Sequence, residues 1–156
     1  LVVYPTYGVG QIEEFDSHEI DGSKHDFVLI NLKQEKMKLR IPMEKTANSG
    51  LRKLSNKNRL TKALNTLEEK PTQKKDMWIK RAKEYEKNIN SGDPVLIAEV
   101  VRDLHKRDDS LEQQSYSERQ IYLTALNRLS NEYAAVQNMD KRMAKKKLED
   151  LLNSQN

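Results

Sequence analysis

The spacing of apolar residues changes near residue 55, and this change constrains the fold more than any other feature of the chain. Before residue 55, short runs rich in β-branched and aromatic residues alternate with turn residues, which is typical of short strands. After residue 55, apolar residues recur three and four positions apart, which is the period of an amphipathic helix. The sequence therefore predicts an α+β chain in which a strand-rich unit (1–55) precedes a helical unit (56–156).

The first unit predicts a small sheet. Its clearest alternation places Met37, Leu39 and Ile41 on one face and Lys38 and Arg40 on the other. Further strands are expected at 1–4, 9–15, 26–32 and 50–54, with a turn at Asp21-Gly22 and a hairpin connection at 33–36. Five short strands in so short a segment are typical of a small, strongly bent β-barrel of the SH3 or Tudor kind.

The second unit predicts a compact all-α domain of about five helices. Leucines at 60, 64 and 67 mark the first helix, and the stripe of Trp78, Ala82, Tyr85 and Ile89 marks the second. Asp93 before Pro94 predicts the start of a third helix, and Ser115 with Glu118 predicts the start of a fourth. A lysine-rich fifth helix is expected at 139–152, a hinge near 68–74 and a polar loop at 108–114.

Composition limits the classes of function. Apolar residues make up 36% of the chain and charged residues 33%, which favours two modest cores. There is no cysteine, and His18, His25 and His105 lack metal-ligand spacing. Phosphate-binding loops and nucleophile elbows are also missing from the sequence. We therefore expect no enzyme, catalytic residue, metal, cofactor or small-molecule substrate.

Location follows from what the sequence lacks. No apolar run approaches the roughly 18 residues of a membrane span, and no signal peptide is visible, so we expect a cytoplasmic protein without a membrane partner. The chain starts at Leu1 within a predicted strand, so we expect the natural N-terminus to lie upstream. The net charge of +4 permits contact with a polyanion.

The only tryptophan lies among basic residues. Seven cations fall between positions 70 and 90: Lys70, Lys74, Lys75, Lys80, Arg81, Lys83 and Lys87. A flat aromatic ring among cations suits a surface that holds phosphates and stacks on, or wedges beside, a base. Trp78 also fits the apolar stripe of its helix, however, and most such tryptophans belong to a core. The residues alone leave both interpretations open.

Two other basic groups have two interpretations each. Lys36, Lys38 and Arg40 fit either a solvated strand edge or an edge that docks a protein partner. Five cations follow near the C-terminus: Lys141, Arg142, Lys145, Lys146 and Lys147. That run fits a solvated helix face balanced by Glu149 and Asp150, and whether it contacts DNA is left open.

Several segments carry a family resemblance through their order and spacing. They are 3–10 (Val3-Tyr4-Pro5-Thr6-Tyr7-Gly8-Val9-Gly10), 37–42, 50–54, 78–81 (Trp78-Ile79-Lys80-Arg81), 91–93, 98–104 and 117–119. Together they resemble the CarD/CdnL family of bacterial transcription regulators over essentially the whole chain. The resemblance implies that 1–55 is an RNA-polymerase-interacting domain, shared with transcription-repair coupling factors. It further implies docking on the polymerase β subunit through Arg40, with Lys36 and Lys38 beside it.

The resemblance also implies a role for the helical domain. Trp78 would wedge into the minor groove of promoter DNA at the upstream edge of the transcription bubble. Lys80, Arg81 and Lys83 would hold the DNA backbone, and Arg119 belongs to the same DNA-binding set. The implied outcome is a longer-lived open complex and a location on the nucleoid through RNA polymerase. Two alternatives of other classes are a nucleoid-type DNA-binding protein that acts without polymerase, and a protein-interaction adaptor with Trp78 in the core.

Overall fold

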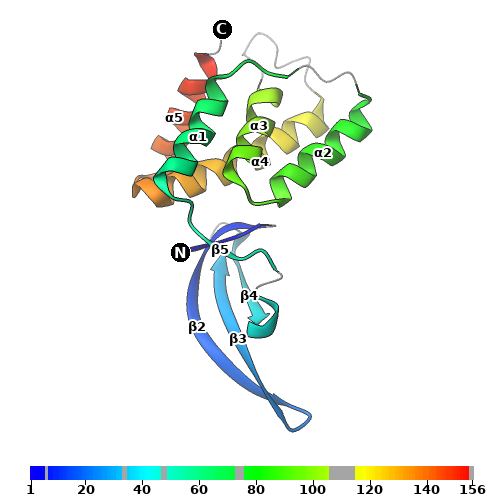
Figure 1. Cartoon of the computed structure of the whole chain (residues 1–156), viewed down its shortest axis with the longest axis vertical. Coiled ribbons are helices and arrows are strands. Elements are labelled where there is room, and N and C mark those ends of the chain that lie inside the picture. The colour runs from blue at the N-terminus through cyan, green and yellow to red at the C-terminus, as the bar shows by residue number, and fades with distance from the viewer. Residues whose placement is uncertain (6, 33–34, 47–48, 73–75, 106–114, 155–156) are drawn as a thin grey trace.

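Five strands precede five α-helices in the part of the chain that the structure describes (Figure 1). The structure is a computed structural model of residues 1–156, and it describes all of them except 6, 33–34, 47–48, 73–75, 106–114 and 155–156. The predicted order, a β unit followed by an all-α unit, is confirmed. The predicted loop at 108–114 lies outside the described residues, as do parts of the predicted hairpin connection and hinge.

The strands form one antiparallel sheet in the order β4-β3-β2-β1-β5. Their bounds are β1 (Val2–Tyr4), β2 (Gly8–Ile20), β3 (Ser23–Leu32), β4 (Met37–Pro42) and β5 (Arg52–Lys53), and a short 3₁₀-helix η2 (Met43–Lys45) follows β4. The core of the sheet consists of Val28, Ile30, Leu32 and Ile41. β4 and β5 lie at the two ends of the strand order, and the SH3 or Tudor assignment stays a prediction.

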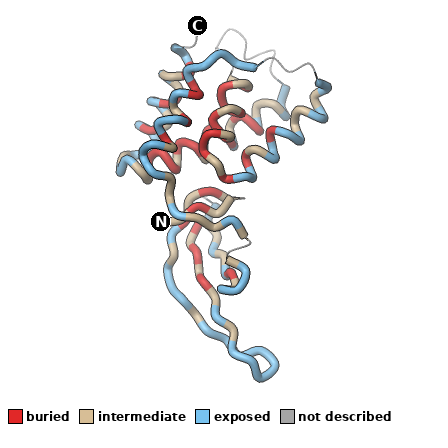
Figure 2. Tube along the Cα trace, in the orientation of Figure 1, coloured by how far each residue is buried: buried red, intermediate tan, exposed pale blue. Residues whose placement is uncertain are grey.

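The hairpin of β2 and β3 is longer than the sequence predicted. Asp21 and Gly22 have φ angles of 52° and 78°, which are typical of the two-residue turn that best matches strand twist. Pairing therefore continues to Ile20 and Ser23, whereas β2 was expected to end at residue 15. β4 pairs only as far as Phe27, so the end of the hairpin projects beyond the sheet, exposed on both faces (Figures 1 and 2). A segment exposed on both faces has no reason to alternate apolar with polar residues, which is why the boundary prediction was wrong.

The third and fourth helices begin where the predicted caps place them. The bounds of the helices are α1 (Lys57–Glu68), α2 (Trp78–Asn90), α3 (Pro94–Leu104), α4 (Tyr116–Gln137) and α5 (Lys141–Asn153). The Asp93 carboxylate accepts a hydrogen bond from the Val95 amide at 2.9 Å, and the Ser115 hydroxyl accepts one from Glu118 at 3.1 Å. Both caps satisfy amides that a helix start otherwise leaves unpaired. The fifth helix starts two residues later than predicted.

The two units have separate cores, as predicted, and Figure 2 shows buried segments in both. The helical core gathers buried side chains from all five helices, among them Leu67, Tyr85, Val101, Leu129 and Leu148. No helix within the described ranges is long and apolar enough to cross a membrane.

The two units also contact each other directly. Arg128 on α4 donates a hydrogen bond to the carbonyl of Pro5 at 2.9 Å. Gly92, between α2 and α3, has a φ of 74°, and a Cβ there would lie 3.2 Å from Pro5. The turn between β1 and β2 therefore packs closely on the turn between α2 and α3.

Candidate functional site

Trp78 is the first residue of α2, and its side chain is half-buried against the helical core. The guanidinium carbon of Arg81 lies 5.4 Å from the indole centroid and 5.9 Å from the ring centroid of Tyr85. The two rings are themselves 6.3 Å apart. Tyr85 is almost fully buried and belongs to the helical core, whereas Trp78 is only partly buried. The contact between the two rings therefore holds the indole at the edge of this core.

Arg81 is committed to this aromatic contact. Its Nε atom is buried and has no hydrogen-bond partner among the described residues. A cation held over a ring face is attracted by the ring quadrupole, and this attraction fixes the orientation of the indole. The predicted role of Arg81 on the DNA backbone stays a prediction, since the described contacts of its side chain are with the two rings.

Met77 and Ile79 flank the tryptophan and are exposed by 78% and 69%. Neither was predicted as a site residue, because neither falls on the apolar stripe of α2. Large apolar side chains that point to solvent beside a half-buried tryptophan make an apolar contact surface. Their position next to Trp78, off the stripe, is the signal that would have identified them.

The other predicted DNA-binding residues lie on α2 and α4. Lys80 is exposed and its Nζ lies 3.8 Å from Asp76 Oδ1, and Lys83 is exposed one turn further along. The structure thus brings Trp78, Lys80, Arg81 and Lys83 together on the first two turns of one helix. Arg119 lies on α4, where its guanidinium carbon is 5.8 Å from the ring of Tyr122.

Tyr122 is buried, and its hydroxyl lies 3.0 Å from His105 Nδ1. Burial, reinforced by the charge of Glu149, raises the pKa of Tyr122 to about 12, while Arg119 acts in the opposite direction. The described ring contact of Arg119 is therefore with a core residue of α4, and it is distinct from the cluster at Trp78.

The alternation predicted for β4 is confirmed: Lys38 and Arg40 are exposed, and Ile41 is buried. Lys38 Nζ lies 3.1 Å from Glu13 Oε2, and Arg40 lies 3.5 Å from Asp16 Oδ2. Lys36 was expected on the same strand face, but it precedes β4 with a φ of 52° and is outside the strand.

Arg40 also lines a cavity of about 510 Å³ at the free edge of β4. The other lining residues are Tyr4, Leu39, Ile41, Pro42, Lys45 and Ser49. An edge strand leaves backbone donors and acceptors unpaired, and such an edge beside a cavity fits the addition of a segment from a protein partner. Within the described ranges, no three His, Asp or Glu side chains are grouped so that they could hold a metal ion.

Two models of known protein families match the chain, one over each unit. Residues 1–55 match the family model of the CarD-like/TRCF RID domain, and residues 62–149 match that of the CarD C-terminal domain. A β unit of this family followed by a helical unit of this family defines a transcription regulator that interacts with RNA polymerase. The second match alone covers more than half of the sequence, and the chain belongs to the CarD/CdnL family.

Proposed function

We propose that this regulator docks on the polymerase β subunit through β4 and stabilises the promoter open complex by wedging Trp78 into the minor groove at the upstream edge of the bubble. The observation that carries the proposal is the half-buried, ring-clamped Trp78 between exposed Met77 and Ile79 on a cationic helix. The action requires no catalytic residue or cofactor, and it places the protein in the cytoplasm, on the nucleoid.

The wedge requires an aromatic edge that is held still before DNA arrives. Arg81 and Tyr85 supply this restraint, so little side-chain freedom remains to be lost on binding. Stacking of one base on an aromatic side chain contributes about 1–3 kcal/mol, which lengthens the lifetime of a complex by about 5-fold to about 150-fold. Wedging acts where bases are already unstacking, and it needs no readout of base sequence.

Docking on polymerase brings the helical domain to the promoter. A tethered helical domain meets the bubble at a high effective concentration, so its affinity for free DNA can be weak. Arg40 and Lys38 now pair with Asp16 and Glu13 on the exposed face of the sheet. Exposed ion pairs contribute only about 0–1 kcal/mol each, so exchanging them for carboxylates of a partner costs little.

The adaptor alternative has one observation in its favour, which is the packing of Trp78 against the helical core. In that case Trp78 supports the fold, and polymerase binding is the whole function. A nucleoid-type protein would instead bind free duplex tightly and with strong salt dependence, without any need for polymerase.

The test is the lifetime of open complexes formed by the cognate polymerase on several weak promoters after a competitor challenge. We expect the protein to lengthen the lifetime about tenfold and Trp78→Ala to abolish this effect. Met143→Ala removes an exposed apolar side chain from α5 and serves as the matched control, with full activity expected. An unchanged lifetime in the presence of the natural protein would overturn the proposal in favour of the adaptor.

A further inference from the structure

We propose that a basic cavity at the junction of the two domains is a second nucleic-acid contact, in which side chains of α4 and α5 bind backbone phosphates. The cavity has a volume of about 360 Å³. Its charged lining residues are Arg128 from α4, Lys141, Arg142 and Lys145 from α5, and Glu35 from the segment before β4. The assignment of the phosphates to DNA rests on the proposed function, whereas the cavity and its charge do not.

The charge of this cavity is concentrated. Four cations and one carboxylate give its lining a net charge of +3, compared with +4 for the whole chain. Lys141, Arg142 and Lys145 form no ion pair with any described residue, whereas Lys38, Arg40 and Lys80 each have a carboxylate partner. Cations gathered without intramolecular compensation attract a polyanion.

The position of these cations in α5 is costly for the helix. Lys141 and Arg142 occupy its first turn, where the helix dipole favours negative charge, and no acidic residue lies in that turn. Lys145 follows one turn later, about 6 Å further along the axis. This spacing lets two lysines of one helix meet charges that repeat along an extended ligand, such as the phosphates of a nucleic-acid strand.

The uncharged lining residues complete the set. Tyr7, Asn127 and Asn131 supply hydroxyl and amide groups, whereas the hydroxyls of Thr124 and Ser130 donate to backbone carbonyls within α4. Hydroxyl and amide side chains, together with Arg and Lys, are the usual partners of nucleic-acid phosphates.

Arg128 is held in the lining of the cavity by the hydrogen bond that it donates to the Pro5 carbonyl. Burial lowers the pKa of Arg128, because the charged guanidinium loses solvent, while Glu35 acts in the opposite direction. A phosphate in the cavity would offset that loss of solvation.

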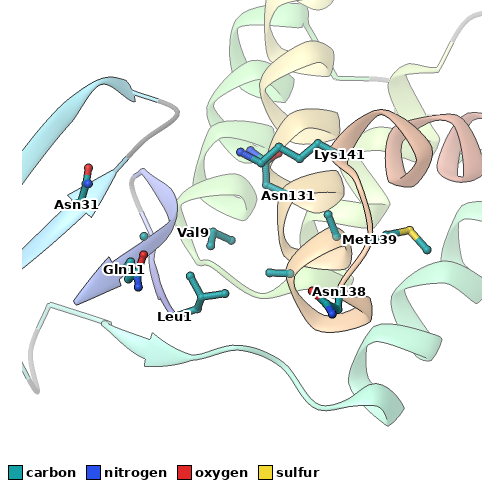
Figure 3. Close-up of a pocket in the computed structure, with 11 residues that line it drawn as sticks. Leu1, Val9, Gln11, Asn31, Asn131, Asn138, Met139 and Lys141 are labelled. Atoms are coloured by element: carbon teal, nitrogen blue, oxygen red, sulfur yellow. The ribbon is translucent and has the colours of Figure 1, made fainter. Parts of the chain in front are cut away.

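A second cavity, of about 260 Å³, adjoins the first. The two share Asn131 and Lys141, which Figure 3 shows on the helical side, opposite Val9 and Gln11 of β2. Two cavities that share a cation favour an elongated ligand over a single small anion.

The test compares two pairs of lysines on the same helix. Lys141→Gln with Lys145→Gln removes two charges that line the cavity, and Lys146→Gln with Lys147→Gln removes two that do not. Affinity of the full chain for a 20-base-pair duplex is measured by anisotropy across a salt series, with Trp78 intact throughout. We expect the first pair to weaken binding about tenfold and to reduce the slope of log K against log salt by about 1 to 2. The second pair should change affinity less than twofold.

Equal losses for both pairs, or no loss for either, would overturn the proposal, because the helix would then act only as diffuse charge or not at all. Amide chemical shifts of Asn127 and Asn131 provide the second arm, with duplex and inorganic pyrophosphate compared at equal phosphate concentration. Larger shifts with duplex support a nucleic-acid site, and equal or larger shifts with pyrophosphate overturn it in favour of a free-phosphate site. Neither readout requires polymerase, so this inference and the effect on open complexes can fail separately.

Discussion

Arg52 and Glu132 form a two-point ion pair across the junction of the two domains, although eighty residues separate them in sequence. The two guanidinium nitrogens of Arg52 donate to the Glu132 carboxylate at 2.9 and 2.8 Å, and the Ser55 amide donates to it at 2.8 Å. Glu132 is almost fully buried on α4. The pair therefore fixes β5 and the start of the interdomain segment on the helical domain, and docking of one domain positions the other.

We expect Glu132→Gln to destabilise the protein by about 2–3 kcal/mol, because the buried group loses its charge and one of its two acceptor oxygens is replaced by an NH₂ donor that faces other donors. Urea unfolding measures this loss. Glu86→Gln, which changes an exposed carboxylate on α2, is the control and should change stability by less than about 0.5 kcal/mol. In a double-mutant cycle with Arg52→Gln, a coupling energy near zero would show that the pair does not join the domains.

Trp78→Ala should lower stability by less than about 2 kcal/mol, because the indole is only half-buried, and should abolish the effect on open complexes. Tyr85→Ala, which empties a fully buried site in the same aromatic contact, should cost about 3–5 kcal/mol. Thermal unfolding distinguishes the two variants. A fall in the midpoint of more than about 10 °C for Trp78→Ala would mean that the tryptophan is a core residue.

Arg40→Glu should abolish co-purification with the polymerase β subunit and leave binding to free DNA unchanged. Lys24→Glu makes the same charge change at an exposed site on the projecting hairpin, and it should have no effect. Asp16→Asn, which releases the ion-pair partner of Arg40, should not weaken docking. Retention of the β subunit by Arg40→Glu would remove β4 from the proposed docking surface.

Stability should fall between about pH 10 and pH 12. The pKa of Tyr122 rises from 10.0 to about 12 in the folded chain, so in this window the unfolded chain releases a proton that the folded chain retains. The contribution is fully present below pH 10 and is lost as pH approaches 12. Unfolding free energies at pH 9 and pH 11.5 measure it.

Tyr122→Phe should reduce this alkaline loss, and Tyr116→Phe, at an exposed site on the same helix, should leave it unchanged. Identical pH profiles for Tyr122→Phe and the natural protein would contradict the assignment to Tyr122.

Local features of this fold could be predicted from the sequence because their causes are local. The caps at Asp93 and Ser115 join a side chain to an amide two or three residues away, so a short window contains both partners. The alternation of Lys38, Arg40 and Ile41 likewise follows from one buried face of one strand.

Long-range features could not be predicted in this way. Nothing near Arg52 in sequence indicates Glu132 as its partner, since their contact depends on how two domains pack. The clamp of Arg81 on Trp78 was missed for another reason, because a cation beside an aromatic residue fits phosphate binding and ring packing equally well. The position of Lys36 outside β4 depends on a left-handed backbone that no glycine signals.

The close approach of Pro5 to Gly92 affects how this protein can be recombined with its relatives. Each turn is the surface on which the other rests, and a side chain larger than glycine at residue 92 would push the first turn away. A chimera joined at residue 55 would pair a β1–β2 turn from one parent with an α2–α3 turn from another. Such hybrids would keep both cores intact, but the contact between the two turns would no longer fit. The two turns therefore have to be exchanged together.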